Sequence, residues 1–269
     1  MSSSRMQRRG LTLVELLTVV TIIGLLVILM LPAILSVRQA VRRTHCQNNL
    51  KQLGIALNAH ESAHRSFPPG ALEEWSWIAR ILPELEEKSL HDQIKFSFDP
   101  FVPPNDEYSD RILPVLLCPS DELSAPIHTA KTEFGTQSFA HTNYLGTLSA
   151  GTSRGMFGRK TGVRMREVDD GAAKTVMVGE RSVVADAGHT HGWWVWGITS
   201  DSYLSANSKL EPGDKLDHDS AYQFWSHHNA GANFVFVDGS VRLLTYDLDE
   251  EVFRAVCSRD GRDYAELDE

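Results

Sequence analysis

An apolar run of 21 residues near the N-terminus constrains this chain more than any other feature. Residues 11–31 read LTLVELLTVVTIIGLLVILML; sixteen are Val, Ile, Leu or Met, three are Thr, one is Gly and one is Glu. At about 1.5 Å per residue, a helix of this length spans the ~30 Å hydrocarbon core of a bilayer. A core helix of a water-soluble protein would carry a polar stripe, which this run lacks. The run predicts a transmembrane helix over residues 11–31.

A secretory signal peptide is the alternative for such a run. Its apolar part is usually about 7–15 residues long and ends at a small-residue cleavage site. Here the run is longer, and Pro32 and a helical pattern follow it in place of an Ala-x-Ala site. We therefore expect the segment to stay in the mature protein as an anchor.

One carboxylate, Glu15, lies inside the apolar run. A carboxylate within a membrane costs about 2.5–3.5 kcal/mol on insertion scales. Such a residue is therefore expected to have a function and a specific partner. Two interpretations stay open. Glu15 lies near enough to the interface to reach water or a proton, or it pairs with a cation in apolar surroundings.

The residues around Glu15 resemble the processing site of type IV prepilins and of the pseudopilins of type II secretion. Two arginines and Gly10 precede Leu11, and Glu15 is the fifth residue after Gly10. The resemblance implies that residues 1–10 are a basic leader. A prepilin peptidase/N-methyltransferase would cleave between Gly10 and Leu11 and methylate Leu11.

The same resemblance gives Glu15 and Pro32 roles in assembly. Pro32 stands where the family commonly has a helix-bending proline. Glu15 would pair with the α-amine of Leu11 on a neighbouring subunit, which rewards one axial stagger between subunits. The usual first mature residue in the family is Phe, so Leu11 departs from the pattern.

The charge of the chain is divided along its length. The net charge is −9, but residues 1–65 hold eight Lys and Arg against two Glu, and the remainder holds 18 basic and 33 acidic side chains. Because a phosphate-binding face needs clustered Lys and Arg, the acidic remainder argues against nucleic acid as a partner. Arginines on both sides of the run leave the positive-inside count nearly balanced.

Residues 32–65 continue in helical period and predict an amphipathic second half of one long helix. Apolar side chains recur at spacings of three and four, and the helix should end before Phe67-Pro68, because a residue that precedes proline is pushed out of the α region. The apolar stripe needs cover, most simply from a sheet. Its members are Ile34, Val37, Val41, Leu50, Leu53 and Leu57.

Residues 66–269 predict a globular α+β domain. Residues 75–90 indicate a second helix, and residues 175–180 and 193–197 read as strands rich in β-branched and aromatic side chains. The pair Asp238-Gly239 between two apolar runs predicts a hairpin with a two-residue turn. In that register Phe234 and Phe236 share the face that lies on the long helix, and Val235 lies on the other face.

Several further blocks resemble the DUF1559 family of prepilin-like proteins along nearly the whole chain. Nine residues separate His228 from Asp238-Gly239, which matches the family's H-X9-DG signature. The resemblance implies a pilin-like fold, in which a long N-terminal helix packs on an antiparallel sheet. The other blocks are residues 46–54, Phe67–Gly70, Leu117–Asp121, Thr142–Gly146 and Val178–Glu180.

The H-X9-DG residues allow two interpretations. His228 and Asp238 could share a site that the last hairpin brings together. Alternatively, His228 pins the loop that leads into the hairpin, and Asp238 is the turn residue. We favour the second, because Asp-Gly has a complete explanation as a turn.

The histidines invite a metal hypothesis, since His189-Thr190-His191 on a strand would place two rings on one face. His227-His228 and the acids Asp217, Asp219 and Asp238 are the other candidates. No His, Cys or acidic pair repeats at a diagnostic metal spacing, however, so the sequence predicts no metal ligands and no cofactor. Calcium or another divalent ion stays open without a particular oxygen set. No hydrolase elbow, phosphate loop or zincin helix is present, so we expect no enzyme activity.

Three cysteines leave one over if a disulfide forms outside the cytoplasm. The favoured pair is Cys46 with Cys118, because both lie in the blocks that resemble the family. Three buried thiols are the alternative. Cys257 would be the residue left over.

These observations lead to one main functional hypothesis. The chain is expected to be a single-pass inner-membrane protein with its N-terminus in the cytoplasm and its C-terminal domain in the periplasm, as the prepilin resemblance requires. Its partners would be the lipid bilayer and other pilin-like subunits of a type II secretion or pilus-like assembly. The alternative is a monomeric tethered binding module that recognises a ligand through the His-rich loops or through Trp193, Trp194 and Trp196.

Overall fold

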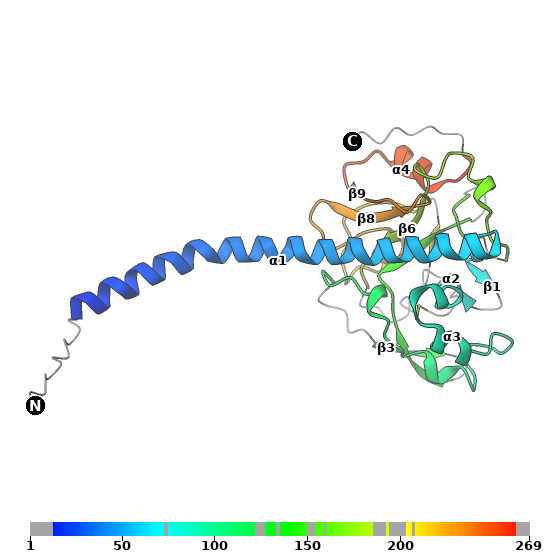
Figure 1. Ribbon diagram of the computed structural model, residues 1–269, viewed down its shortest axis with the longest axis horizontal. Helices are drawn as coiled ribbons and strands as arrows, with labels where there is room; N and C mark the ends of the chain where they lie inside the picture. Colours follow the sequence, from blue (N-terminus) through cyan, green and yellow to red (C-terminus); the bar gives the residue numbers. More distant parts are fainter. Residues whose placement is uncertain are drawn as a thin grey trace, which may run out of the picture. The chain divides into compact units, whose positions relative to one another are not determined.

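The computed structural model describes residues 13–72, 75–121, 127–132, 135–149, 154–158, 160–184, 192–193, 203–205 and 208–261. The chain divides into two compact units, Met1–Arg42 and Arg43–Glu269. Helix α1, Leu13–His64, contributes residues to both units (Figure 1). A long N-terminal helix followed by a sheet-containing globular domain confirms the predicted α+β class.

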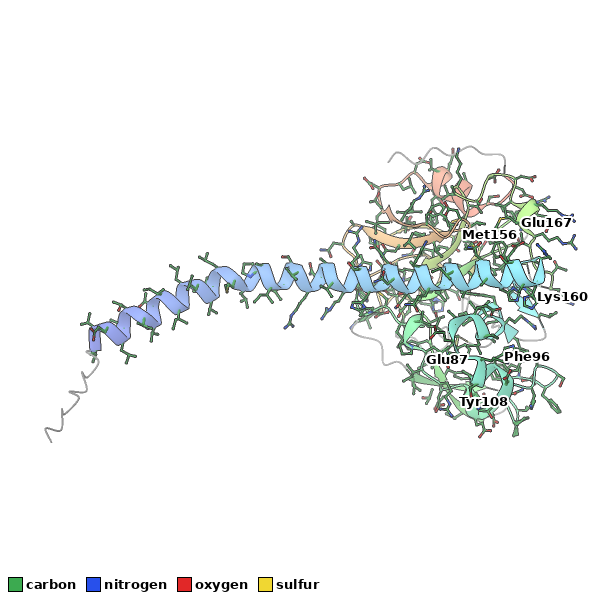
Figure 2. The ribbon with its side chains drawn as sticks, in the orientation of Figure 1. Glu87, Phe96, Tyr108, Met156, Lys160 and Glu167 are labelled. Atoms are coloured by element: carbon green, nitrogen blue, oxygen red, sulfur yellow. A yellow bond between two sulfur atoms is a disulfide. The ribbon has the colours of Figure 1, made fainter. Side chains whose placement is uncertain are left out.

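The described part of the first unit is an apolar helix with nothing covering it. Every large apolar side chain between Leu13 and Leu35 exposes about half or more of its surface, from 48% at Val19 to 80% at Leu13 (Figure 2). Such a surface is unfavourable in water and is stable when lipid or other apolar helices cover it. By length and composition, α1 can cross a membrane.

The polar groups in this part of α1 are compatible with that environment. The hydroxyls of Thr18, Thr21 and Ser36 donate to helix carbonyl oxygens three or four residues earlier, at 2.8–3.0 Å. In lipid, such internal hydrogen bonds replace those that water would make. Pro32 lies inside the helix and removes one backbone donor. The blue part of α1 bends in Figure 1.

The last part of α1 forms one side of the core of the second unit. Cys46, Leu50, Leu53 and Leu57 have no exposed surface, and their spacing of three and four residues is the predicted helical period. The other predicted members of the stripe, residues 34, 37 and 41, belong to the first unit and are exposed. The helix ends at His64, before Phe67-Pro68, as expected.

A five-stranded sheet, ordered β7-β5-β6-β8-β9, covers the buried stripe of α1. Three of its four strand pairs are antiparallel, as predicted, and β5 with β7 is parallel. Two antiparallel pairs lie outside this sheet: β1 (Ala71–Leu72) with β2 (Trp75–Ser76), and β3 (Ile127–Thr132) with β4 (Gly135–Ala140). The strands of the five-stranded sheet are β5 (Tyr144–Leu148), β6 (Val176–Glu180), β7 (Tyr203–Ser205), β8 (Gly231–Phe236) and β9 (Val241–Thr245).

The β8-β9 hairpin differs from the prediction in register. Val235 pairs with Val241, and the Phe236 backbone N–H donates to the Ser240 carbonyl at 2.9 Å. Three residues therefore form the turn, and the last of them, Gly239, has a left-handed φ of 79°. The predicted two-residue turn is wrong, because glycine in this conformation suits a three-residue turn that closes with a bulge.

The faces of the hairpin are also reversed relative to the prediction. Val235 lies in the cluster with α1, whereas Phe234 and Phe236 lie in a second cluster with Phe253 of α4, Glu250–Cys257. The rings of Phe234 and Phe253 are 5.5 Å apart. In Figure 1, β8 and β9 accordingly lie between α1 and α4. The helix approaches β8 too closely for a phenyl ring, since a Cβ atom on Gly54 would be 2.6 Å from Val235 Cγ2.

Residues 75–90 do not form the predicted single helix. Two short helices replace it, α2 (Trp77–Arg80) and α3 (Lys88–Gln93), with a 3-10 turn that begins at Pro83 between them. Pro83 lacks the N–H that a continuous helix needs, and Glu86 has a left-handed φ of 65°. Phe96, labelled in Figure 2, follows α3 and packs its ring 5.0 Å from that of Trp75.

The remaining elements are short. The predicted strand at residues 175–180 is β6, whereas Trp193 lies in a turn and the rest of the predicted strand at 193–197 lies outside the described residues. Short strands and helices are β1 (Ala71–Leu72), β2 (Trp75–Ser76), α2 (Trp77–Arg80), α3 (Lys88–Gln93), β3 (Ile127–Thr132) and β4 (Gly135–Ala140). The 3-10 turns are η1 (Pro83–Leu85), η2 (Asp106–Tyr108), η3 (Pro114–Leu116), η4 (Met165–Glu167) and η5 (His218–Tyr222).

The close approach at Gly54 gives a first prediction. Gly54→Val should lower the free energy of unfolding of the second unit by about 1–3 kcal/mol, because the added side chain overlaps Val235. Val235→Ala in the same chain should recover part of the loss. Urea unfolding of the full chain in detergent, followed by tryptophan fluorescence, measures both effects. Gly24→Val is the control, because a Cβ atom there meets nothing within 4 Å; equal stability of Gly54→Val and wild type would contradict the packing.

Candidate functional site

The candidate site forms around a disulfide that joins α1 to the loop after η3. Cys46 and Cys118, the pair favoured from the sequence, are bonded, with their Cα atoms 5.1 Å apart, and both side chains are buried. The bond spans a sequence separation of 72 residues. In the chain-entropy model, a cross-link of this size stabilises the folded state by about 4 kcal/mol. Cys257 is free and buried.

A buried carboxylate at the end of β6 faces this disulfide. The side chain of Glu180 is 1% exposed. Its Oε2 accepts two hydrogen bonds from Asn233, one from the backbone N–H at 2.7 Å and one from Nδ2 at 2.9 Å. Its Oε1 accepts no hydrogen bond from the described residues and lies 3.5 Å from Nε2 of His228. One half of the carboxylate is therefore fixed, and the other half points at an imidazole.

His228 completes what we call the cysteine cluster: Cys46, Cys118, Glu180 and His228. The ring Nε2 of His228 lies 3.9 Å from Sγ of Cys118. The backbone N–H of His228 donates to Ser226 Oγ at 3.0 Å, and that hydroxyl donates to the Gly231 carbonyl at 2.7 Å. These bonds fix the turn that carries the ring. One potential ligand atom from each cluster residue lies within 4.8 Å of the others.

A second buried carboxylate, Asp121, lies next to the cysteine cluster. Its Oδ2 accepts hydrogen bonds from Asn143 Nδ2 and from the Val183 backbone N–H, both at 2.8 Å. Its Oδ1 is 3.4 Å from Nε2 of His227. Asn143 Oδ1 in turn accepts from the Cys118 backbone N–H at 2.8 Å. The amide of Asn143 thus connects the aspartate to the disulfide.

Polar side chains of α1 bind to the same region. Asn49 Nδ2 donates to the Leu117 carbonyl at 2.8 Å, and Gln47 Nε2 donates to Asn233 Oδ1 at 3.1 Å. The Tyr144 hydroxyl donates to the Cys46 carbonyl at 3.4 Å. Burial raises the pKa of Tyr144, with the charge of Glu180 adding to the effect, so this phenol stays protonated.

The H-X9-DG residues lie at opposite ends of β8. His228 precedes the strand and Asp238 follows it, and a six-residue strand is about 20 Å long. Asp238 Oδ1 accepts from the Ser240 backbone N–H at 2.8 Å, which is a turn role, and the Gly239 carbonyl accepts from Lys51 Nζ at 2.7 Å. The structure therefore does not bring His228 and Asp238 into one site. It gives the two halves of the motif separate contacts.

The other residues singled out from the sequence lie outside the described residues or in other elements. Gly10, Leu11, the His189–His191 pair, Trp194 and Trp196 lie outside the described residues. Glu15 lies in the first turn of α1. Trp193 is fully buried and its Nε1 donates to the Arg111 carbonyl at 2.8 Å, so it is a core residue and offers no binding face.

Sequence reasoning assigned no role to Glu180, Asp121 or Asn233. The available signal was in β6, where the apolar run Val176–Gly179 ends directly in a carboxylate. A strand buried along its whole length that ends in an acid places this acid at the edge of the core. Asp121 and Asn233 carry no comparable local pattern, because their neighbours come from distant parts of the chain.

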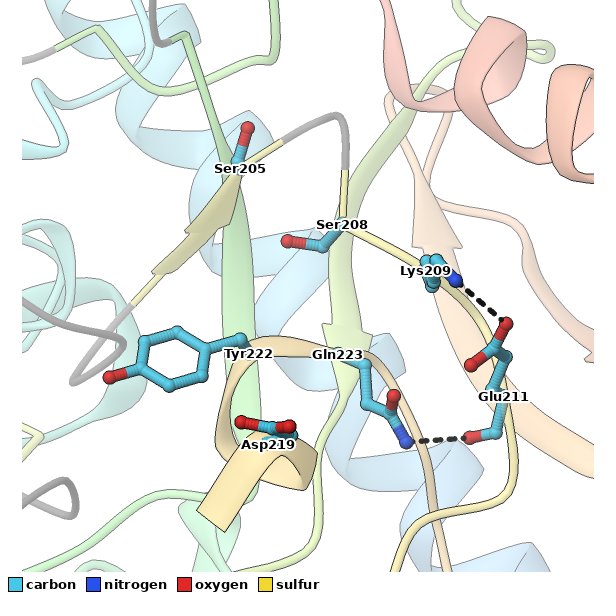
Figure 3. A pocket seen from close by; sticks show the side chains of 7 residues that line it. All are labelled: Ser205, Ser208, Lys209, Glu211, Asp219, Tyr222 and Gln223. Carbon is cyan, nitrogen blue, oxygen red and sulfur yellow. Dashed lines mark hydrogen bonds and ion pairs between the residues drawn. The ribbon is translucent and has the colours of Figure 1, made fainter.

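A surface hollow of about 470 Å³, drawn in Figure 3, is lined by residues that do not belong to the cysteine cluster. Its lining is polar, and several of its groups bind one another. Lys209 Nζ is 3.3 Å from Glu211 Oε1, and Gln223 Nε2 donates to the Glu211 carbonyl at 3.4 Å. Both charged side chains of the pair are half exposed. The hollow therefore resembles a solvated surface more than an enclosed binding site.

Comparison with known proteins gives the family of the chain. A family model described as a protein of unknown function (DUF1559) matches residues 35–251. The match covers most of the chain, which therefore belongs to this family. It begins inside α1, after the apolar run, so it does not include the residues that resemble the prepilin site. No curated protein and no solved structure matches the chain significantly.

The family and the apolar N-terminal helix together indicate a membrane-anchored pilin-like protein. The cysteine cluster lies in the matched region. Three of its residues come from blocks by which the sequence resembled the family, and the fourth, His228, is the histidine of the H-X9-DG signature. The anchor and the cluster thus belong to different units of the chain.

The histidine next to Asn143 gives a pH prediction. Burial lowers the pKa of His141 to about 4; the Asp121 carboxylate opposes the shift and the Arg181 guanidinium adds to it. Because the folded state disfavours the charged ring, its stability is complete above pH 6.5 and falls as the pH drops towards 4. His141→Gln should remove roughly 2–3 kcal/mol of that acid-dependent loss.

Urea unfolding of the full chain at pH 7.5 and at pH 4.5 measures this difference. His45→Gln is the matched control, because His45 lies exposed on α1. The same acid-dependent loss in His141→Gln and in wild type would show that another group causes it.

Proposed function

We propose that the chain is a pilin-like structural subunit that assembles through its N-terminal helix into a type II secretion or pilus-like filament. The observation that carries this proposal is the exposed apolar surface of α1 between Leu13 and Leu35. Lipid covers that surface before assembly, and the helices of neighbouring subunits cover it afterwards. Association between such helices depends on packing and on a few polar contacts, since lipid is as apolar as the helices.

Glu15 supplies the polar contact in this proposal. Removal of residues 1–10 creates an α-amine on Leu11, and the Glu15 carboxylate of one subunit pairs with the amine of its neighbour. A charge-assisted bond in apolar surroundings is strong, and an unpaired carboxylate there is penalised. The pair therefore favours one stagger between adjacent helices.

The compartment follows from the same hypothesis. The domain would be extracytoplasmic, where a disulfide such as Cys46–Cys118 persists. Arg38, Arg42 and Arg43 follow the apolar run and suit anionic head groups or a neighbouring acidic domain. The role is mechanical and requires no reaction on this chain. Prepilin peptidase would act on the chain as its substrate.

Processing is tested by the mature N-terminus. We expect the chain isolated from membranes to begin at Leu11 with a methylated amine, because Gly10 and the following residues resemble a prepilin site. Intact-mass and N-terminal peptide mass spectrometry measure both features. A chain that retains Met1 or Arg5 would contradict processing. A Gly10→Leu variant is the control, which should stay unprocessed while still inserting into the membrane.

Assembly is tested by Glu15→Ala. The variant should insert into membranes as wild type does, because it removes a charge from an apolar helix, but it should lose crosslinked oligomers, because the contact between adjacent helices is gone. Crosslinking in membranes, followed by immunoblotting, measures the ladder of oligomers. Glu61→Ala, in the last part of α1, is the matched control and should keep the ladder. Unchanged oligomers in Glu15→Ala would defeat the role of this carboxylate.

A further inference from the structure

The cysteine cluster brings together four side chains of the types that bind metal ions. Two sulfur atoms, one imidazole nitrogen and one carboxylate oxygen lie within 4.8 Å of one another. The four side chains come from α1, from the loop after η3, from the end of β6 and from the turn before β8. Four separate segments of the second unit therefore place their ligand-type atoms at one point in the core.

A second observation points to a ligand here: Oε1 of Glu180 accepts no hydrogen bond from the part of the chain that the structure describes. A buried carboxylate oxygen without a hydrogen bond is costly, and native proteins rarely leave one. Oε2 is held by Asn233, and this leaves Oε1 directed at the ring of His228. Carboxylates that bind metals are commonly held in this way, with one oxygen hydrogen-bonded and the other on the ion.

Two distances within the cluster are close to those around a tetrahedral ion. With ligand bonds of about 2.0–2.3 Å, tetrahedral zinc separates its ligand atoms by roughly 3.3–3.8 Å. The His228 Nε2 to Glu180 Oε1 distance is 3.5 Å, and the His228 Nε2 to Cys118 Sγ distance is 3.9 Å. The two sulfur atoms have to separate, because they are bonded to each other in the structure, and the other ligand atoms already lie within 4.8 Å of one another.

We propose that the dithiol form of the cysteine cluster binds one zinc ion through Cys46, Cys118, Glu180 and His228, and that the metal-bound and disulfide forms are alternative states of the same cross-link. Both forms tie α1 to the loop that carries Cys118. The chain is synthesised with thiols, so the metal-bound form can precede the disulfide. This inference does not depend on the filament hypothesis.

The exchange between the metal-bound form and the disulfide form conserves electrons and protons. Binding of the ion to the dithiol releases the two thiol protons and forms two thiolate–metal bonds. Oxidation by a small-molecule disulfide breaks those bonds and forms the Sγ–Sγ bond. The two electrons reduce the oxidant to two thiols, which take up two protons, and the ion is released.

The ligand set favours zinc over the hard cations. Thiolate and imidazole suit borderline and soft ions, whereas magnesium and calcium prefer sites made of oxygen atoms only. Four protein ligands leave no open position for water or substrate, which is typical of a structural zinc site. The proposed ion would therefore hold the fold together and would not catalyse a reaction.

Zinc content of the full chain in detergent provides the first test. The chain is reduced with a phosphine without oxygen, mixed with zinc chloride, and desalted before elemental analysis. We expect one zinc per reduced chain and none per oxidised chain. Equal zinc in both forms, or none in the reduced form, would overturn the proposal.

Variants identify the ligands. Glu180→Gln and His228→Gln should each weaken zinc binding by the reduced chain at least tenfold, as measured by competition with a chelator. Two matched controls should bind as wild type does. They are His227→Gln, whose ring faces Asp121, and Cys257→Ser, which removes the thiol outside the cluster. Wild-type affinity in both ligand variants would overturn the assignment.

A measurement on the wild-type chain alone tests the site even if the variants fail to fold. Zinc should slow formation of the Cys46–Cys118 bond by added oxidised glutathione at least tenfold, and a chelator should restore the rate. Acid quenching, alkylation and peptide mass spectrometry follow the bond with time. A rate that does not respond to zinc would contradict the site.

Discussion

The close packing of α1 on β8 is the contact on which the second unit depends. Gly54 lets the helix approach until Val235 fills the space beside it. That approach buries the stripe from Cys46 to Leu57 completely and brings Cys46 to Cys118. A helix held one side chain farther out would leave this stripe partly in water and would separate the polar groups that meet beneath it.

The buried polar groups beneath α1 are the costly part of this fold. Glu180 and Asp121 are both removed from water, and the amides of Asn233 and Asn143 stabilise one oxygen of each. In proteins generally, hydrophobic side chains of similar volume often stabilise the fold as well as buried charged groups do. Such groups are typical of a site with a specific task, which fits a metal cross-link better than it fits packing alone.

The sequence predicts the local elements of this chain well and their mutual arrangement less well. The helical spacing of apolar residues predicted the buried part of α1, and Phe67-Pro68 predicted where the helix ends. The sequence predicted the wrong face of the β8-β9 hairpin to pack on α1. Alternation of side chains along a strand distinguishes two faces, but here both faces are apolar. The contact between Gly54 and Val235 selects the face, and it joins residues 181 positions apart. The prediction of one helix at residues 75–90 was wrong for a local reason, because Pro83 lacks the N–H that a continuous helix needs.

The sequence by itself determined the apolar span, the charge division and the helix that continues beyond Pro32, because each depends on composition or on a short period along the chain. It also singled out the cysteine pair and His228. Only the tertiary structure decided that His228 and Asp238 are at opposite ends of a strand, and that Glu180 meets His228 and the two sulfur atoms. Four distant segments form that cluster, and their distances are set by packing, which no local pattern encodes.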